Sequence, residues 1–266
     1  KLLDRRAVIR DPEQPIPLND CKGNIEFKNV SFAYIKQDYV LKDISFNIRQ
    51  GEKVAFVGAT GAGKSSIMNL LCRFYDAQIG EITVDGINIK DIKQSELRKN
   101  IGLVVQDIFL FSDSISNNIS LNNNSIPESR IKEAGSIIGI DHFISKLPLG
   151  YGQNVKERGV TLSQGERQLI TFARALAYDP KILILDEATS SVDTHSEILI
   201  QNAIDKLMDG RTSIIIAHRL STIQKCDKII VMHKGEIRET GTHQQLLELG
   251  GIYSRLYQLQ YKDSFV

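Results

Sequence analysis

The stretch GATGAGKS at residues 58–65 constrains the fold more than any other part of the chain. It fits the pattern G-x-x-x-x-G-K-[ST], and it lies between the apolar run VAFV at 54–57 and a segment with helical periodicity. The apolar residues of that segment are Ile67, Leu70, Leu71 and Phe74. A glycine-rich turn without a ligand is the alternative, and it fits this context poorly. A strand, this loop and an amphipathic helix in this order predict a phosphate-binding loop in an α/β fold.

In such a loop the glycines allow the backbone N–H groups to surround phosphate oxygens. The Lys64 side chain would reach the β- and γ-phosphates of a nucleotide, and the Ser65 hydroxyl would ligate Mg²⁺. We therefore expect the loop and the first turn of the helix to bind the phosphates. The expected contacts are Gly58, Thr60, Gly61, Ala62, Gly63, Lys64, Ser65 and Ser66.

Two carboxylates follow the apolar strand in KILILDEATS, residues 181–190. We expect Asp186 to hold Mg²⁺ through water, and Glu187 to orient and deprotonate the water that attacks the γ-phosphate. A common alternative is that one of these acids only caps the next helix. A phosphate-binding loop in the same chain favours the catalytic interpretation.

A histidine follows a second apolar strand in SIIIAHR, residues 213–219. A lone histidine is more often structural than catalytic. Strand ends in an open parallel sheet, however, face the ligand crevice, so His218 is predicted on the same edge as the loop and Glu187. A neutral imidazole there could contact the γ-phosphate or the attacking water.

The N-terminal half contains a predicted antiparallel layer. Residues 25–34 and 40–48 alternate like strands, with a slip in register near Asn29 that predicts a bulge. ITVDGINI at 82–89 is typical of a hairpin, because two short β-rich runs flank an Asp-Gly pair.

The second half predicts helices and a parallel sheet. From about 112 to 165 the chain is polar and helical, with a helix expected to begin after Pro127. Strands then alternate with helices, as in a parallel sheet. These predicted strands are 182–185 and 213–218, and the helices are about 166–178 and 195–208. The predicted fold class is α/β: a P-loop NTPase core with a mainly parallel sheet, an N-terminal antiparallel β subdomain and an inserted α-helical subdomain at about 107–170.

LSQGERQ at 162–168 is a second candidate for anion binding. A serine and a glycine precede a predicted helix, and free backbone N–H groups at a helix N-terminus bind anions. An ordinary serine-capped helix start explains the same residues. Both interpretations stay open at this point.

Composition excludes several other classes. Lys plus Arg number 33 and Asp plus Glu 32, which leaves a net charge of +1 and no basic field of the kind that nucleic-acid binding requires. The longest apolar runs are far shorter than the roughly 20 residues that cross a bilayer. The three cysteines lack metal-ligand spacing, so we interpret them as packing residues.

The P-loop, the Asp-Glu pair, the histidine and LSQGE, in this arrangement over about residues 24–260, resemble the nucleotide-binding domain of an ABC transporter. The resemblance implies ATP and Mg²⁺ as cofactors, and ATP hydrolysis as the activity. It also implies that adenine stacks on Tyr34, that Gln106 touches Mg²⁺ and relays to a membrane domain, and that Asp193 crosses to a partner subunit. Each of these residues has a structural alternative. Tyr34 would be a core residue of its strand, Gln106 a solvated amide at a strand end, and Asp193 the cap of the next helix.

In this family the LSQGE segment acts on another chain's nucleotide. The resemblance implies that Ser163, Gly165 and the helix N-terminus close over the γ-phosphate held by a second nucleotide-binding domain, identical or paralogous. The commonest family version is LSGGQ, so Gln164 and Glu166 are departures. We expect Glu166 to accept from a ribose hydroxyl or to face away.

The type of transporter that the chain resembles is an exporter with membrane helices and ATPase on one polypeptide. Residues 1–23 resemble a linker from a missing transmembrane domain, before an ATPase domain at 24–266. DIFLFSDSISNNI after Gln106 and VKERG at 155–159 resemble exporter segments. The full-length protein is then expected to be a multi-pass membrane protein with this domain at the cytoplasmic face and no nucleic-acid partner.

Three other classes of protein are alternatives to the exporter. The head of a DNA-maintenance protein would add long coiled coils or a basic groove, and a separate importer ATPase would begin near residue 24. A non-hydrolysing, nucleotide-gated binding module would not need Glu187 and His218, and a phosphate-release assay distinguishes it. The transported substrate stays open, because its contacts would lie in the membrane domain.

Overall fold

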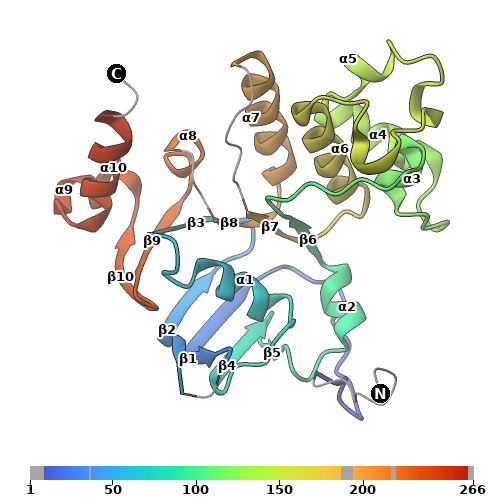
Figure 1. The fold of residues 1–266 in the computed structure, drawn as a ribbon. Coiled ribbons are helices and arrows are strands. Elements are labelled where there is room, and N and C mark those ends of the chain that lie inside the picture. The colour runs from blue at the N-terminus through green and yellow to red at the C-terminus, as the bar shows by residue number, and fades with distance from the viewer. Residues whose placement is uncertain (1–8, 36, 187–193, 217–219, 263–266) are drawn as a thin grey trace.

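The computed structural model describes residues 9–35, 37–186, 194–216 and 220–262. Two sheets lie one above the other, and most helices cover the upper one (Figure 1). Glu187, Asp193 and His218 lie outside the described residues, so the structure does not test their predicted positions.

The lower sheet is antiparallel, with strand order β2-β1-β4-β5. Its strands are β1 (Ile25–Ala33), β2 (Tyr39–Ile48), β4 (Ile79–Val84) and β5 (Ile87–Asn88). The register between β1 and β2 shifts between Phe27 and Val30, and Asn29 has a φ of 49°, so the predicted bulge is confirmed. The predicted hairpin around Asp85 and Gly86 is also present, as β4 and β5.

The upper sheet has, among the described residues, the strand order β10-β9-β3-β8-β7-β6. Its strands are β3 (Lys53–Val57), β6 (Ile101–Val104), β7 (Ile182–Asp186), β8 (Thr212–Ile216), β9 (Lys228–His233) and β10 (Glu236–Gly241). Its neighbours are parallel, except that β10 pairs antiparallel to β9. The predicted α/β class with a mainly parallel sheet is confirmed.

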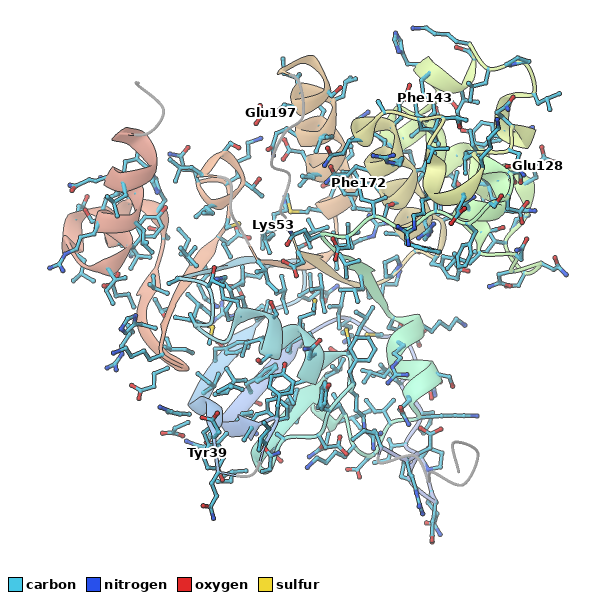
Figure 2. All side chains as sticks on the ribbon, viewed as in Figure 1. Tyr39, Lys53, Glu128, Phe143, Phe172 and Glu197 are labelled. Atoms are coloured by element: carbon cyan, nitrogen blue, oxygen red, sulfur yellow. The ribbon has the colours of Figure 1, made fainter. Side chains whose placement is uncertain are left out.

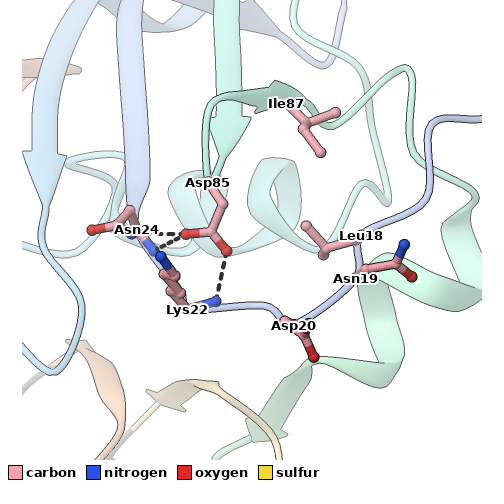
Figure 3. A pocket seen from close by; sticks show the side chains of 7 residues that line it. All are labelled: Leu18, Asn19, Asp20, Lys22, Asn24, Asp85 and Ile87. Atoms are coloured by element: carbon pink, nitrogen blue, oxygen red, sulfur yellow. Dashed lines mark hydrogen bonds between the residues drawn. The ribbon is translucent and has the colours of Figure 1, made fainter.

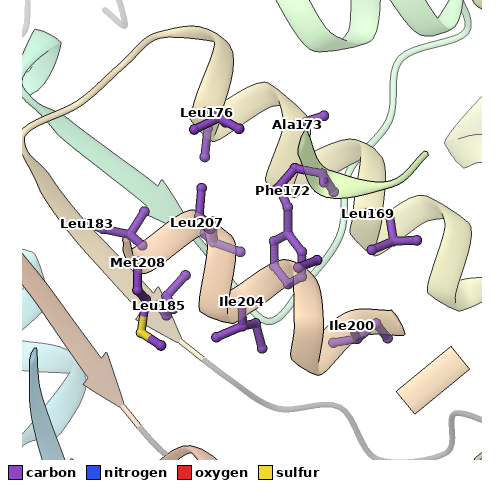
Figure 4. Close-up of a cluster of buried hydrophobic side chains, with 14 of the residues drawn as sticks. Leu169, Phe172, Ala173, Leu176, Leu183, Leu185, Ile200, Ile204, Leu207 and Met208 are labelled. Carbon is purple, nitrogen blue, oxygen red and sulfur yellow. The ribbon is translucent and has the colours of Figure 1, made fainter. Parts of the chain in front are cut away.

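Apart from the edge strand β10, which is polar and partly exposed, the strands of the upper sheet are buried on both faces, which explains why they are mostly apolar rather than alternating. Val54 and Phe56 of β3 pack into the core shared with the lower sheet and with α1 (Lys64–Leu71). Ala55 and Val57 pack into a second core with α6 (Gln164–Ala177) and α7 (Thr194–Met208). Figure 4 shows β7, α6 and α7 meeting in this second core. The helices α1 and α6 therefore lie on opposite faces of one sheet.

The helical spacing predicted after the phosphate-binding loop is wrong at its last residue. Phe74 continues the spacing of Ile67, Leu70 and Leu71, but α1 ends at Leu71 and Phe74 is 44% exposed. The left-handed backbone of Arg73, with a φ of 51°, ends the helical path and turns Phe74 outward. There the Phe74 ring stacks under the guanidinium of Arg98.

Short helices separate β6 from α6, as the polar composition predicts. They are α3 (Ile115–Ser120), α4 (Glu128–Ile138), α5 (Asp141–Ile144), η1 (Gly150–Gly152) and η2 (Glu157–Gly159). The helix expected after Pro127 is α4, whose N-cap is that proline. Phe143 and Phe172 are buried among the helices above the sheet (Figure 2).

The remaining helices of the described residues are α2 (Gln94–Lys99), α8 (Leu220–Ile223), α9 (His243–Leu249) and α10 (Ile252–Lys262). These helices and the β9–β10 pair were not predicted from the sequence. Within the described ranges, no helix combines the length and the apolar character that a membrane span requires.

The segment before β1 is docked onto the domain. The Ile16 N–H donates to the Asp91 carbonyl at 2.8 Å, and the Leu18 N–H donates to the Glu96 carboxylate at 2.7 Å. The Asp85 carboxylate accepts from the backbone N–H groups of three successive residues, Lys22 to Asn24, beside an open cavity of about 500 Å³ (Figure 3). These hydrogen bonds fix the path of the chain into β1.

Candidate functional site

The phosphate-binding loop predicted at residues 58–65 connects β3 to α1. Gly58 and Gly63 have φ angles of 154° and 105°, which residues with a side chain rarely adopt. A Cβ on Gly58 would collide with the Met232 carbonyl oxygen, and one on Gly63 would lie 2.7 Å from Leu41 Cδ2. Only glycine fits at these two positions, so the residues present suit a backbone cradle for phosphate oxygens.

Lys64 is the cation of this loop. Its side chain is 7% exposed, and Nζ donates to the carbonyl oxygens of Gly58 at 2.6 Å and of Ala59 at 3.2 Å. Burial lowers the pKa of Lys64, and the nearby Asp186 carboxylate opposes that shift. The ammonium group is therefore held over the loop by oxygen atoms of the loop itself.

Asp186 is the last residue of β7, and it is partly buried. Because β3, β8 and β7 are parallel, the ends of β3 and β7 lie at the same edge of the sheet, where Asp186 acts electrostatically on Lys64. Ser65 in the first turn of α1 is exposed. The structure thus brings Lys64 and Asp186 to the same edge of the sheet.

Tyr34 follows the last residue of β1 and is 46% exposed, so it is not a core residue of the strand. Its hydroxyl accepts a hydrogen bond from Asn69 Nδ2 at 2.9 Å and lies 3.2 Å from Ser66 Oγ. Both partners belong to α1. The aromatic ring predicted to bind adenine is therefore attached to the helix that the phosphate-binding loop precedes.

The contact of Asn69 with Tyr34 was not predicted. Asn69 lies between the apolar residues Met68 and Leu70 in the second half of α1, which is the only signal that the sequence offers. Its partner follows β1 and lies 35 residues away, and sequence spacing alone does not indicate that contact.

Gln106 is exposed and follows β6, the strand next to β7. It lines an open cavity of about 310 Å³ together with side chains from the segment before α6 and from its first turns. The lining residues are Gln106, Asp107, Ile108, Arg158, Gln164 and Arg167. The structure thus brings the predicted relay glutamine next to two other predicted segments, VKERG and LSQGERQ.

The second candidate, LSQGERQ, forms the start of α6 with a capping box. Ser163 Oγ accepts from the Glu166 N–H at 3.2 Å, and the Glu166 carboxylate accepts from the Ser163 N–H at 2.8 Å. Gly165 is buried. Of the two orientations expected for Glu166, the structure has it turned away, onto the N-terminus of its own helix.

The two candidate anion sites do not meet within this chain. The phosphate-binding loop leads into α1 on one face of the upper sheet, and LSQGERQ begins α6 on the other. Among the described residues, no hydrogen bond or ion pair joins residues 162–168 to residues 58–66.

Comparisons with known proteins agree with this architecture. A family model described as ABC transporter matches residues 41–190. The chain is 53% identical over 238 residues to the probable multidrug resistance ABC transporter ATP-binding/permease protein YheH of Bacillus subtilis, covering 90% of this chain and 35% of that protein. It is 46% identical over 265 residues to an ATP-dependent lipid A-core flippase of Syntrophus aciditrophicus, covering 100% of this chain and 44% of the flippase.

A solved structure to which the chain is similar is also an ABC transporter. The chain superposes on a bacterial Atm1-family ABC exporter with ATP bound, with a TM-score of 0.89 and 39% sequence identity, over 97% of this chain and 45% of the exporter. This chain therefore spans less than half of the length of the proteins to which it is similar here.

Proposed function

Because this chain belongs to the ABC transporter family and has the ATPase domain of its exporters, we propose that it dimerises around two ATP molecules to drive export of a substrate through a membrane domain. The partner is a second nucleotide-binding domain, identical or paralogous. The membrane domain is part of the same full-length chain, a multi-pass membrane protein, and this domain lies at its cytoplasmic face.

The observation that carries the proposal is the separation of the two candidate anion sites. The glycine cradle with Lys64 and Asp186 lies at one edge of the upper sheet, whereas α6 packs on the face opposite α1. Ser163 and Gly165 then bind the γ-phosphate of the nucleotide held by a second chain. The α6 helix of that second chain binds the nucleotide held here. Asp193 contributes at the same interface.

The residues of the first site suit Mg-ATP. The cradle leaves no room for side chains at Gly58 and Gly63, and Ser65, Asp186 and Gln106 offer the hard oxygen atoms that Mg²⁺ prefers. Mg²⁺ bound there would neutralise charge on the β- and γ-phosphate oxygens. Lys64 neutralises further charge, and Tyr34 stacks on the adenine.

Hydrolysis requires a base and an oriented water. Glu187 accepts a proton from the water whose oxygen attacks the γ-phosphorus, while the bond from that phosphorus to the ADP oxygen breaks. His218 orients the γ-phosphate or the water. Glu166 remains in its capping box and holds the helix start that presents Ser163 and Gly165.

The surface around Gln106 suits the membrane domain. Phe109 and Phe111 are 52% and 51% exposed, and their rings pack perpendicular to each other. They follow Ile108, which lines the same cavity as Gln106 and Arg158. Exposed aromatic pairs at a polar-rimmed hollow are typical of protein contact surfaces. We assign this surface to contact with the cytoplasmic side of the membrane domain.

The Glu187→Gln variant tests the proposal. The amide keeps the size of the side chain but cannot accept the proton, so hydrolysis should slow by about 10²- to 10⁴-fold, the usual cost of losing general acid–base catalysis. ATP binding should persist, and a dimer should become stable enough to isolate by gel filtration with Mg-ATP. ADP should dissolve that dimer, because it lacks the γ-phosphate.

The Ser163→Arg variant is the matched control for the second site. It should block hydrolysis while a monomer still binds ATP. Loss of ATP binding by the monomer would show that LSQGE binds the nucleotide of its own chain. A Glu187→Gln protein that never dimerises, alone or with candidate paralogues, would also contradict the two-chain site.

A further inference from the structure

The ring of Tyr34 is supported by two other aromatic rings. Phe32, which is buried, lies 4.7 Å from it between ring centroids at an interplanar angle of 79°. Tyr75 lies 5.0 Å from it at 89° and is also in contact with Phe32, at 5.6 Å. Perpendicular rings at these separations attract each other through their quadrupoles. The three rings therefore form one cluster, in which Tyr34 contacts both Phe32 and Tyr75.

The backbone just before Tyr34 is held by a side chain. Pairing between β1 and β4 ends at Ser31 and Ile79, and beyond it the Gln78 amide takes the place of a strand. The Ala33 N–H donates to Gln78 Oε1 at 2.9 Å, and Gln78 Nε2 donates to the Ala33 carbonyl at 2.9 Å. One side chain thus satisfies both backbone groups of the residue that precedes the ring.

Tyr75 and Gln78 come from the same short connection, residues 72–78, between α1 and β4. This connection is anchored by Arg73, which is 3% exposed and whose guanidinium donates to the carbonyl oxygens of Ile89 at 3.2 Å and Ile92 at 3.0 Å. A buried guanidinium with several acceptors fixes its backbone firmly. Tyr75 and Gln78 are therefore presented to Tyr34 from a rigid support.

We propose that Tyr75 and Gln78 are positioning residues for the nucleobase, acting through Tyr34: Gln78 fixes the backbone and Tyr75 fixes the ring plane on which the base stacks. The proposal rests on the proposed function, because it takes Tyr34 as the adenine platform. Under this proposal the connection after α1 supports the platform that binds the base, whereas the loop before α1 binds the phosphates. The two ends of α1 therefore lead to the two parts of the nucleotide site.

The neighbouring residue Phe74 shows that this contact is selective. Phe74 and Tyr75 are each 44% exposed, and they are adjacent in the chain. The Phe74 ring contacts the Arg98 guanidinium, whereas Tyr75 turns to Tyr34. A substitution at Phe74 therefore removes an equally exposed aromatic ring without touching the platform, which makes it a matched control.

The test measures by calorimetry the affinities of the purified chain for Mg-ATP and for Mg-tripolyphosphate, which has the phosphates but no base. Tyr34→Ala should weaken ATP binding about five- to a hundred-fold, as expected for loss of base stacking. Tyr75→Ala and Gln78→Ala should weaken it about two- to ten-fold, because the first removes one perpendicular ring pair and the second removes the two hydrogen bonds to Ala33 that hold the backbone before the ring. Tripolyphosphate affinity should stay unchanged in all three variants.

Two conservative variants separate positioning from general stability. Tyr75→Phe keeps the ring and should bind ATP like the unmodified chain, as should Phe74→Ala. Gln78→Glu keeps the size but loses the N–H donor to the Ala33 carbonyl, so it should behave like Gln78→Ala. Thermal unfolding of every variant shows that each is folded at the temperature of the assay.

The energetic coupling between Tyr75 and Tyr34 decides whether Tyr75 acts through Tyr34. The double variant Tyr34→Ala/Tyr75→Ala should bind ATP no more weakly than Tyr34→Ala alone, because Tyr75 has then no ring to position. Additive losses, an equal loss of tripolyphosphate affinity, or no loss in Tyr75→Ala and Gln78→Ala would overturn the proposal. Failure of the proposed function gives a different result: the unmodified chain would not bind ATP, or Tyr34→Ala would leave ATP affinity unchanged.

Discussion

The phosphate-binding loop and the start of α6 are both turns before a helix N-terminus, but they are built by different chemistry. The loop depends on backbone angles that only glycine adopts readily, and on close contacts with Met232 and Leu41. The start of α6 has ordinary angles, with Ser163 at φ −63° and ψ 163°, and it is closed by the capping box of Ser163 and Glu166.

This difference explains how specific each motif is. A concave cradle of backbone N–H groups next to a lysine serves few purposes other than holding phosphates. A serine-capped helix start occurs in many proteins and satisfies its own N–H groups. The first turn therefore indicates a ligand by itself, whereas the second does not, and only the proposed function gives it a role, at a partner's nucleotide.

The strongest test of this contrast is Gly58→Ala. The new Cβ would meet the Met232 carbonyl oxygen at a φ of 154°, so steric overlap and backbone strain should together lower the free energy of unfolding by about 2 to 5 kcal/mol. Urea denaturation measures the change. Gly61→Ala is the control, because its φ of 81° is strained but no atom lies within 4 Å, and about 1 to 2 kcal/mol is expected. Equal losses at both positions would show that Met232 does not constrain the loop.

The next test is Lys64→Ala, which acts on binding. Removing the one side-chain cation of the loop should weaken Mg-ATP binding by about 1.5 to 3 kcal/mol, roughly 10- to 150-fold, the usual worth of hydrogen bonds to a charged group. Calorimetry checks this, with the exposed Lys132 of α4 as the control position. An unchanged affinity would remove the loop from the nucleotide site.

Local patterns predicted most of the fold. Continuous apolar runs predicted β3, β7 and β8, because a strand covered on both faces has no polar side to display. The register slip at Asn29 and the Asp-Gly hairpin were predicted because bulges and tight turns have specific backbone requirements. The same logic placed Lys64 and Asp186 at one edge of the sheet.

The parts that were missed depend on contacts distant in sequence. Phe74 continues the apolar spacing of α1, but a left-handed Arg73 ends the helix, and the anchor of that arginine lies at Ile89 and Ile92. The Gln78 amide forms hydrogen bonds with the backbone of Ala33 at the end of β1, 45 residues earlier in the chain. Tertiary partners decide such features, so spacing within a short window does not predict them.

The smallest effect is expected at the start of α6, and it decides whether the helix cap and the LSQGE segment are one structure with two roles. Ser163→Ala removes the acceptor for the Glu166 N–H, so the free energy of unfolding should fall by about 1 kcal/mol, the typical cost of losing an N-cap. Glu166→Gln should cost less than about 0.5 kcal/mol, because glutamine also serves in capping boxes and its amide oxygen still accepts from the Ser163 N–H. Neither change should alter the affinity of the monomer for Mg-ATP, whereas the same Ser163→Ala protein should lose hydrolysis in the dimer. If Ser163→Ala instead weakened ATP binding by a dilute monomer, α6 would act on the nucleotide of its own chain, and the contrast between the two turns would fail. If Glu166→Gln destabilised the chain as much as Ser163→Ala, the negative charge at the N-terminus of α6 would matter more than the capping geometry, because a carboxylate there also interacts favourably with the helix dipole.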